Sequence, residues 1–73
     1  MLAQANLTDT AILTAREHQI LELVAHGLST KEVARHVQIA PRTVDRHVDN
    51  VRFKLRARNR IHMVTCAMIG DLL

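Results

Sequence analysis

The sequence has few of the residues that cross-link, bend or stack within small proteins. Cys66 is its only cysteine, so no internal disulfide can form, and a reducing cytoplasm is the expected compartment. Phe53 is its only aromatic residue, which leaves an aliphatic core. The run of about 18 apolar residues that a membrane helix needs is missing, and so is a charged-then-apolar leader, so the sequence favours neither a membrane span nor secretion.

Patterns for catalysis and metal binding are missing as well. The two glycines, Gly27 and Gly70, stand alone, so the sequence has no glycine-rich loop to hold phosphates. No Ser/His/Asp or Cys/His arrangement typical of nucleophilic catalysis is visible. None of the five histidines lies four residues from another, as a helical zinc site requires. We therefore expect no enzyme, no metal site and no cofactor.

What the sequence does contain is helical periodicity. A chain of 73 residues has room for one small domain, which buries only ~60% of the surface that its unfolded form exposes. Residues 1–13 show no clear period and are interpreted as a tail or the remnant of a linker, and residues 14–73 as the domain. The apolar spacing predicts an all-α fold, a four-helix bundle with a helix-turn-helix, whose helices span about residues 15–26, 30–37, 41–56 and 60–72.

Signals at the ends of these helices support the prediction. Two capping boxes mark the starts of the first two helices: Thr14 with Glu17, and Ser29 with Glu32. Gly27 can end the first helix in a left-handed conformation. Pro41 suits the first turn of the third helix, and Asn59 can cap the fourth.

Two side chains fall on unexpected sides of their helices. Glu17 lies on the apolar side, where a carboxylate needs a partner. We hypothesise a salt bridge from Glu17 to Arg60 or Lys54; the alternative is that the capping box alone occupies the carboxylate. Phe53 lies away from the apolar side, and we expect it to cover the last helix or the N-terminal segment rather than to stack on nucleic acid.

The predicted third helix has one apolar edge and a charged outer face. The apolar edge is formed by Val44, Val48, Val51 and Leu55. Residues 29–58 hold eight basic residues against three acidic ones, a net charge of +5, whereas residues 1–28 carry −2 and residues 59–73 are neutral. This form is typical of a recognition helix that reads base edges in the major groove. From the pattern alone, an ordinary amphipathic helix with a solvated charged face fits as well.

Spaced motifs in this region resemble those of a known family. They are LTARE (13–17), AHGLSTKEVA (25–34), PRTVDRH (41–47) and KL (54–55). Together they resemble the LuxR/GerE-type helix-turn-helix domain over about residues 13–73, and with IHMV (61–64) they are most similar to the FixJ/NarL response-regulator output domain. The resemblance implies a bacterial transcription regulator that binds double-stranded DNA through residues 41–56 and dimerises through residues 60–72.

The outer face and the resemblance together indicate the DNA-contacting residues. The base-reading candidates are Arg42, Asp45, Arg46, Asp49 and Asn50. The phosphate-contact candidates are Ser29, Thr30, Lys31, Thr43, Val44, His47 and Lys54. For Thr30 and Lys31 the alternative is simple solvent exposure.

The sequence departs from the family pattern on this helix. Ala40 stands where a serine usually caps it, and the loss of such a cap costs about 0.5–2 kcal/mol. Asp45 and Asp49 stand where some members carry lysine. We expect these two carboxylates chiefly to orient Arg42 and Arg46.

The predicted last helix is apolar on more than one side, and a small core can bury only one of them. The dimer-interface candidates are Ile61, Thr65, Met68, Ile69 and Leu72. Alternatively, residues 1–13 fold back over this surface. A second function is also open, in which the surface makes the chain a protein-interaction module with weak or no DNA binding. RNA polymerase is a further candidate partner.

Overall fold

The computed structural model describes residues 13–73, and this part of the chain contains helices and no strands. The helices are α2 (Ala15–Ala25), α3 (Thr30–Val37), α4 (Pro41–Lys54) and α5 (Arg60–Ile69). None of them has the length and apolar character that a membrane span requires. The predicted all-α fold is confirmed. Residues 1–12, most of the predicted tail, lie outside the described residues, and so does the alternative that this segment covers the last helix.

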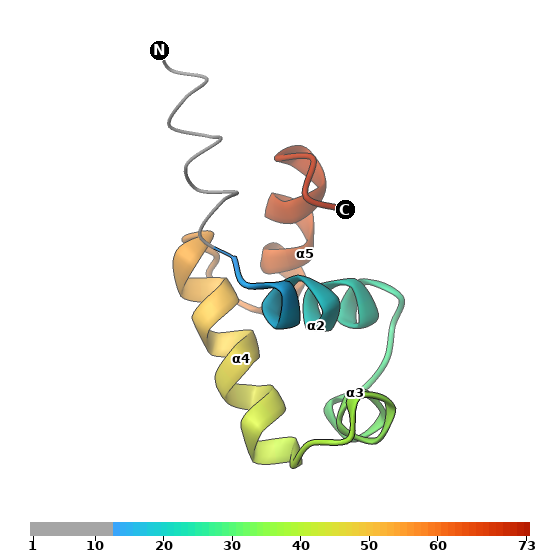
Figure 1. Cartoon of the computed structure of the whole chain (residues 1–73). Helices are drawn as coiled ribbons and strands as arrows, with labels where there is room; N and C mark the ends of the chain where they lie inside the picture. The colour runs from blue at the N-terminus through green and yellow to red at the C-terminus, as the bar shows by residue number, and fades with distance from the viewer. Residues whose placement is uncertain (1–12) are drawn as a thin grey trace.

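The helix-turn-helix, formed by α3 and α4, lies at one end of the molecule (Figure 1). In this view α4 runs along the plane of the picture while α3 is seen nearly end on, so the two helices cross steeply. α4 packs against both α2 and α3, and α5 packs against α2 and α4 at the end opposite to α3. One long face of α4 remains exposed.

The core is aliphatic, as the lack of aromatic residues predicts. Its fully buried side chains are Ile20, Leu21, Val33, Val44, Val51 and Met63. Because these residues come from α2, α3, α4 and α5, each helix contributes its apolar side to one shared core. Val48 is also buried and Leu55 is half-buried, which confirms the predicted apolar edge of α4.

Each helix is followed by a residue in the left-handed conformation. These residues are Gly27, Gln38, Arg56 and Asp71. The N–H of the next residue then donates to the carbonyl five positions back: Leu28 to Leu23 (3.2 Å), Ile39 to Ala34 (3.1 Å), Ala57 to Arg52 (2.9 Å) and Leu72 to Ala67 (2.8 Å). This geometry ends α4 at Lys54 and α5 at Ile69, so the predicted ends at residues 56 and 72 are too late.

Side-chain caps begin three of the helices. Thr14 Oγ1 accepts from the Glu17 N–H at 3.0 Å, and Glu17 Oε1 accepts from the Thr14 N–H at 2.9 Å. The same reciprocal pair joins Ser29 and Glu32. The side-chain oxygen of Asn59 caps α5. The predicted caps are therefore confirmed.

Glu17 is 4% exposed and joins two helices. Its carboxylate accepts a hydrogen bond from Lys54 Nζ at 2.8 Å, in addition to the Thr14 N–H. Burial raises the pKa of this carboxyl group, but the hydrogen bonds from Lys54 and Thr14 and the nearby positive charge outweigh burial, so the pKa lies below its ordinary value of 4.5. The hypothesised salt bridge is confirmed with Lys54; Arg60 instead donates to Thr30 Oγ1.

Phe53 does not pack on the last helix. Its side chain is 83% exposed, so that prediction is wrong. The cause is its position on α4, opposite the valine edge, which turns the ring away from the shared core. Cover by the N-terminal segment lies outside the described residues.

Glu17→Gln is expected to lower the free energy of unfolding near neutral pH by about 1–3 kcal/mol, because a neutral amide replaces the charged acceptor of the Lys54 ammonium. Folding depresses the pKa of Glu17, so its contribution is present above the unfolded-state pKa and is lost as the pH falls through the folded-state value. Thermal denaturation from about pH 7 to about pH 3 measures both effects. Glu22→Gln, at an exposed position of the same helix, is the control. Equal melting temperatures for the two variants across this range would contradict the prediction.

Candidate nucleic-acid interface

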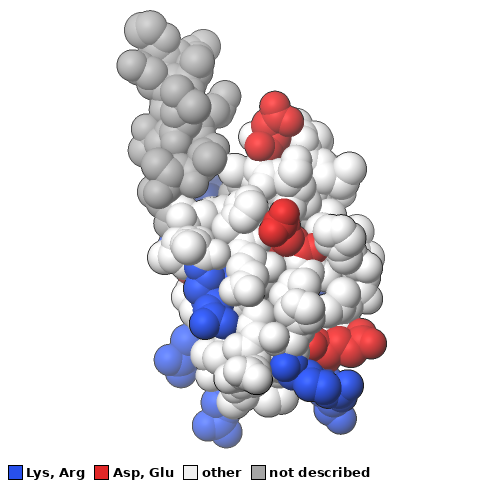
Figure 2. Space-filling view, turned by 45° about the vertical axis from the view of Figure 1, so that its right-hand side comes forward, with Lys and Arg blue, Asp and Glu red and all other residues white. Residues whose placement is uncertain are grey.

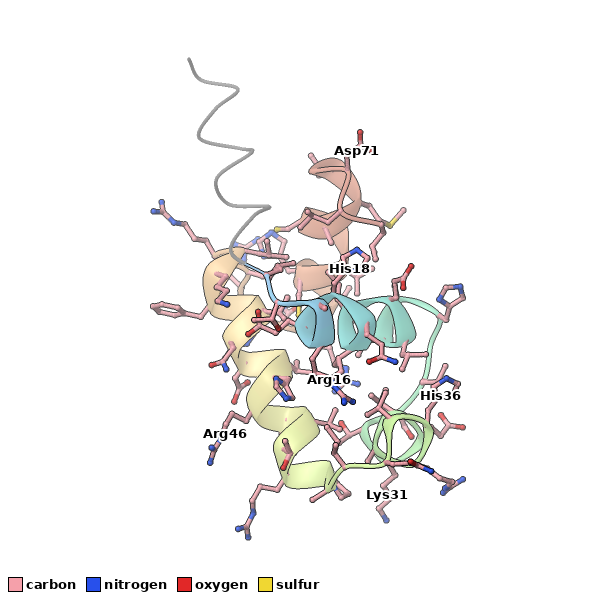
Figure 3. The ribbon with its side chains drawn as sticks, in the orientation of Figure 1. Arg16, His18, Lys31, His36, Arg46 and Asp71 are labelled. Atoms are coloured by element: carbon pink, nitrogen blue, oxygen red, sulfur yellow. The ribbon has the colours of Figure 1, made fainter. Side chains whose placement is uncertain are left out.

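Basic side chains gather at the end of the molecule formed by α3 and the start of α4. Figure 2 shows Lys and Arg side chains grouped toward the lower end of the face in view. At this end, Lys31 points outward from α3 and Arg46 points outward from α4, while Arg16 lies beneath α2 (Figure 3). Arg16 Nη1 donates to the Val37 carbonyl at 3.4 Å, which brings a further cation to the end of α3. Part of the positive charge of residues 29–58 therefore gathers at this end, whereas Lys54, Arg56 and Arg58 lie at and beyond the C-terminal end of α4.

The exposed face of α4 carries three of the base-reading candidates in a line. Arg42, Arg46 and Asn50 recur at every fourth position and are all exposed. Within residues 13–73 neither arginine forms an ion pair, so both guanidinium groups can donate to an external acceptor. A guanidinium presents two parallel N–H donors, which match the O6 and N7 acceptors of guanine.

The two aspartates of α4 have different partners. Asp49 Oδ1 lies 3.6 Å from Arg52 Nη2, an ion pair along the helix. Asp45 Oδ1 accepts from the Thr30 hydroxyl at 3.3 Å and forms no ion pair with any described residue. The expectation that these carboxylates orient Arg42 and Arg46 is therefore wrong. Its physical reason is the position of Asp45, which lies beside the start of α3 rather than in the arginine line.

The first turn of α3 reaches the surface beside α4. Ser29 and Lys31 are exposed and Thr30 is half-buried. The N–H groups of Thr30 and Lys31 occupy the first two helical positions, which have no acceptor within the helix. The helix dipole adds to their attraction for an anion. The Thr30 hydroxyl, however, is engaged, because it accepts from Arg60 Nη1 at 3.0 Å and donates to Asp45.

Four phosphate-contact candidates on the other flank of α4 differ in their access to solvent. Val44 is fully buried and its N–H donates to the carbonyl four residues back; its phosphate contact stays a prediction. Lys54 holds Glu17, which gives its ammonium a role in the fold. Thr43 and His47 are half-buried. His47 Nδ1 is buried and has no hydrogen-bond partner within the described part of the chain.

α5 presents an apolar surface to solvent. Ile61 is 81% exposed, Met68 64% and Ile69 82%. Thr65 is exposed as well. Leu72 is only 8% exposed, because it lies beyond the end of α5 and the chain there folds back onto the core. Its place in a dimer interface stays a prediction, and this burial leaves little of its side chain for a partner.

Sequence periodicity misses the position of Arg60. Its guanidinium joins the start of α5 to the start of α3, since it donates to Thr30 Oγ1 and, at 3.5 Å, to the Leu28 carbonyl. The one local signal is Asn59, whose cap fixes the first turn of α5 and so the direction in which Arg60 leaves it. The periodicity of a sequence gives no signal for a contact between residues so far apart along the chain as Arg60 and Thr30.

A short capped helix, a tight turn and a second helix with an exposed basic face define a helix-turn-helix domain of the DNA-binding kind. The sequence pattern of the GerE family, described as "Bacterial regulatory proteins, luxR family", matches residues 11–67. The chain belongs to this family. It is accordingly a DNA-binding regulatory domain and not an enzyme.

Curated relatives share this domain. The chain is 41% identical over 58 residues to the transcriptional regulatory protein FixJ of Rhizobium meliloti (strain 1021), covering 80% of this chain and 28% of that protein. It is 43% identical over 53 residues to the transcriptional regulatory protein DesR of Bacillus subtilis (strain 168), covering 73% and 27%. It is 43% identical over 60 residues to the transcriptional activator protein VanR of Vibrio anguillarum, covering 82% and 25%. The chain thus spans about a quarter of the length of these relatives.

Ala40 precedes α4 without a side-chain cap, as the sequence predicts. Ala40→Ser is expected to raise the free energy of unfolding by about 0.5–2 kcal/mol, because the serine oxygen can accept from an N–H of the first turn. Thermal denaturation measures this as a rise in melting temperature of about 4–8 °C per kcal/mol for a domain of this size. Ala15→Ser, at an exposed position just after the Thr14 cap, is the control and should change little. A rise in melting temperature no larger than that of Ala15→Ser would contradict the prediction.

Proposed function

We propose that this chain binds double-stranded DNA in a sequence-specific manner, with α4 in the major groove, and that it regulates transcription from the sites it binds. The observation that carries the proposal is the line of exposed donors on α4, in which Arg42 and Arg46 form no ion pair with a described residue and Asn50 follows. The names of the relatives, two transcriptional regulatory proteins and one transcriptional activator, support the regulatory role.

The reading face of α4 suits base edges. The major groove, about 12 Å wide, admits one α-helix. Arg42 and Arg46 are expected to donate to guanine O6 and N7, and Asn50 to pair with adenine N6 and N7. Asp45 and Asp49 remain candidates that accept from cytosine N4, although Asp49 must first leave its ion pair within the helix.

Phosphate contacts would fix the domain on the duplex. The first turn of α3 offers the N–H groups of Thr30 and Lys31, the Ser29 hydroxyl and the Lys31 ammonium to one phosphate. Thr43 and His47, half-buried on the other flank of α4, would meet the DNA backbone across the groove. Contacts of this kind set position and orientation and carry no base preference themselves.

We further propose that α5 pairs with α5 of a second copy. The exposed face of this helix is formed by Ile61, Thr65, Met68 and Ile69. An apolar hollow beside Ile61, lined in part by Val24 and Leu28, can receive a side chain of the partner. A two-fold pair would set the two copies of α4 about one turn of DNA apart, ~10 bp.

The exposed face of α5 also favours a second function, in which the chain is a protein-interaction module with weak or no DNA binding. RNA polymerase is the candidate partner of that function. The uncapped start of α4 at Ala40 and the charge of Asp45 and Asp49 would weaken the attraction of α4 for DNA. Either function would operate in the cytoplasm, where Cys66 stays a thiol.

The double variant Arg42→Ala, Arg46→Ala is expected to bind a selected duplex at least ~30-fold more weakly, because each bidentate contact to guanine is worth ~1–3 kcal/mol. Fluorescence anisotropy at several salt concentrations gives the affinity and the number of phosphates neutralised. The control, Arg56→Ala with Arg58→Ala, removes the same charge from the loop after α4. Equal losses in the two double variants would show that charge alone drives binding. No binding by the unaltered chain at low salt would favour the second function.

We expect two copies of the unaltered chain, but only one copy of the double variant Ile61→Ser, Ile69→Ser, to bind each duplex that contains two half-sites. The reason is that the substitutions remove the apolar pairing surface. Sedimentation velocity of the complexes measures the stoichiometry. Both isoleucines are more than 80% exposed, so the melting temperature should not change. Phe53→Ser, which removes a similarly exposed side chain from α4, is the control. Two bound chains per duplex in the isoleucine variant would rule out pairing through α5.

A further inference from the structure

Three helices meet in one chain of side-chain hydrogen bonds. Arg60, the first residue of α5, donates from Nη1 to Thr30 Oγ1 at 3.0 Å. Thr30, the first residue of α3, donates from this oxygen to Asp45 Oδ1 at 3.3 Å. Arg60 Nη2 also donates to the Leu28 carbonyl, so the guanidinium is held at two points. The chain of bonds therefore ends at a carboxylate on the exposed part of α4.

The chemistry of the groups fixes the direction of these bonds. A guanidinium has only donors, and an ionised carboxylate has only acceptors. The Thr30 hydroxyl has a single hydrogen, and the bond to Asp45 uses it. That hydrogen cannot point to a DNA phosphate at the same time. The Thr30 hydroxyl therefore donates to Asp45, and only the backbone N–H of Thr30 remains open to a phosphate.

Asp45 differs in this respect from the other aspartate of α4. Asp49 lies against Arg52, and that guanidinium partly neutralises its charge. Asp45 is exposed and forms no ion pair within the described residues, and the group that donates to it is the neutral hydroxyl of Thr30. A neutral donor fixes the position of a carboxylate without cancelling its charge. Asp45 therefore presents its carboxylate at a defined place, on the end of the molecule where the basic side chains gather, with the Arg60 guanidinium one hydrogen bond away on Thr30.

We propose that Asp45 is a specificity-determining residue that accepts a hydrogen bond from the N4 amine of a cytosine, and that Thr30 and Arg60 are the positioning residues that hold its carboxylate. This inference rests on the proposed entry of α4 into the major groove. Asp45 follows Arg42 by three residues, so the two side chains are neighbours on the helix surface and can contact nearby base pairs.

A carboxylate selects a base by attraction and by repulsion. In the major groove cytosine offers the N4 donor, whereas guanine offers the acceptors O6 and N7 and thymine offers the acceptor O4. A carboxylate facing either of the latter bases is repelled. Because Thr30 already restricts the side chain of Asp45, less rotational freedom is lost on binding than for a carboxylate that moves freely. A negative charge that weakens attraction to every duplex thus provides discrimination between duplexes.

Two measurements test this proposal. Duplexes are first selected from a randomised pool, and affinities are then measured for single-base variants of the selected duplex. The unaltered chain is expected to prefer cytosine at one position of each half-site. Asp45→Asn is expected to shift that position toward adenine by at least ~5-fold, because an asparagine side chain pairs with adenine N6 and N7. Asp71→Asn, at an exposed position after α5 and at the opposite end of the molecule, is the matched control: it removes the same charge and should leave the preference unchanged.

The role of Thr30 is tested with two variants of similar size. Thr30→Val removes the hydroxyl and keeps the branched shape, and it should reduce the cytosine preference several-fold. Thr30→Ser restores the hydroxyl and should restore the preference. The salt dependence of binding should be alike in both variants, because the number of neutralised phosphates does not change. Thermal denaturation of each variant shows whether the fold is intact.

Three outcomes would overturn the proposal at different levels. If Asp45→Asn selects the same bases as Asp71→Asn, Asp45 does not determine specificity. If Asp45→Asn changes the preference but Thr30→Val does not, Thr30 and Arg60 are not positioning residues. If the unaltered chain binds no duplex, the proposed function fails, and this inference fails with it.

Discussion

A buried polar contact, the ion pair between Glu17 and Lys54, ties α4 and its proposed reading face to α2. A carboxylate among aliphatic side chains is tolerated only when donors satisfy it, and the Lys54 ammonium and the Thr14 N–H do so. The contact joins the first turn of α2 to the last turn of α4, while α3 packs against the body of α4. The direction of α4 therefore depends on a pair that lies ~18 Å along the helix from Arg42. The pair that stabilises the position of α4 and the arginines proposed to contact DNA thus lie at opposite ends of the same helix.

Most of the fold could be predicted from the sequence because it depends on neighbours along the chain. The capping boxes at Thr14 and Ser29 and the apolar edge of α4 are local patterns, and the structure contains them. The ends of α4 and α5 were predicted too late because the left-handed residues that follow them are Arg56 and Asp71. A glycine in the sequence indicates a left-handed residue at the end of a helix, as Gly27 does, whereas an arginine or an aspartate gives no such indication.

The candidate site could be predicted less completely, because its residues depend on how the helices cross. Periodicity identifies the exposed line on α4, but it does not say which side chain of another helix lies opposite. Lys54 suits a phosphate on the flank of α4 as well as it suits the buried Glu17, and only the packing of α2 decides between them. The contact between Thr30 and Asp45 likewise needs α3 and α4 to be placed in three dimensions.

The turn between α3 and α4 contains Gln38 in the left-handed conformation, where most chains would place a glycine. A side chain in this conformation costs the folded state roughly 1–2 kcal/mol. It also restricts the unfolded chain more than glycine would, which offsets part of that cost. The result is a stiff turn, so α3 and α4 would approach DNA as one preorganised unit. In a complex of the proposed kind, the protein would lose little conformational entropy between encounter and docking.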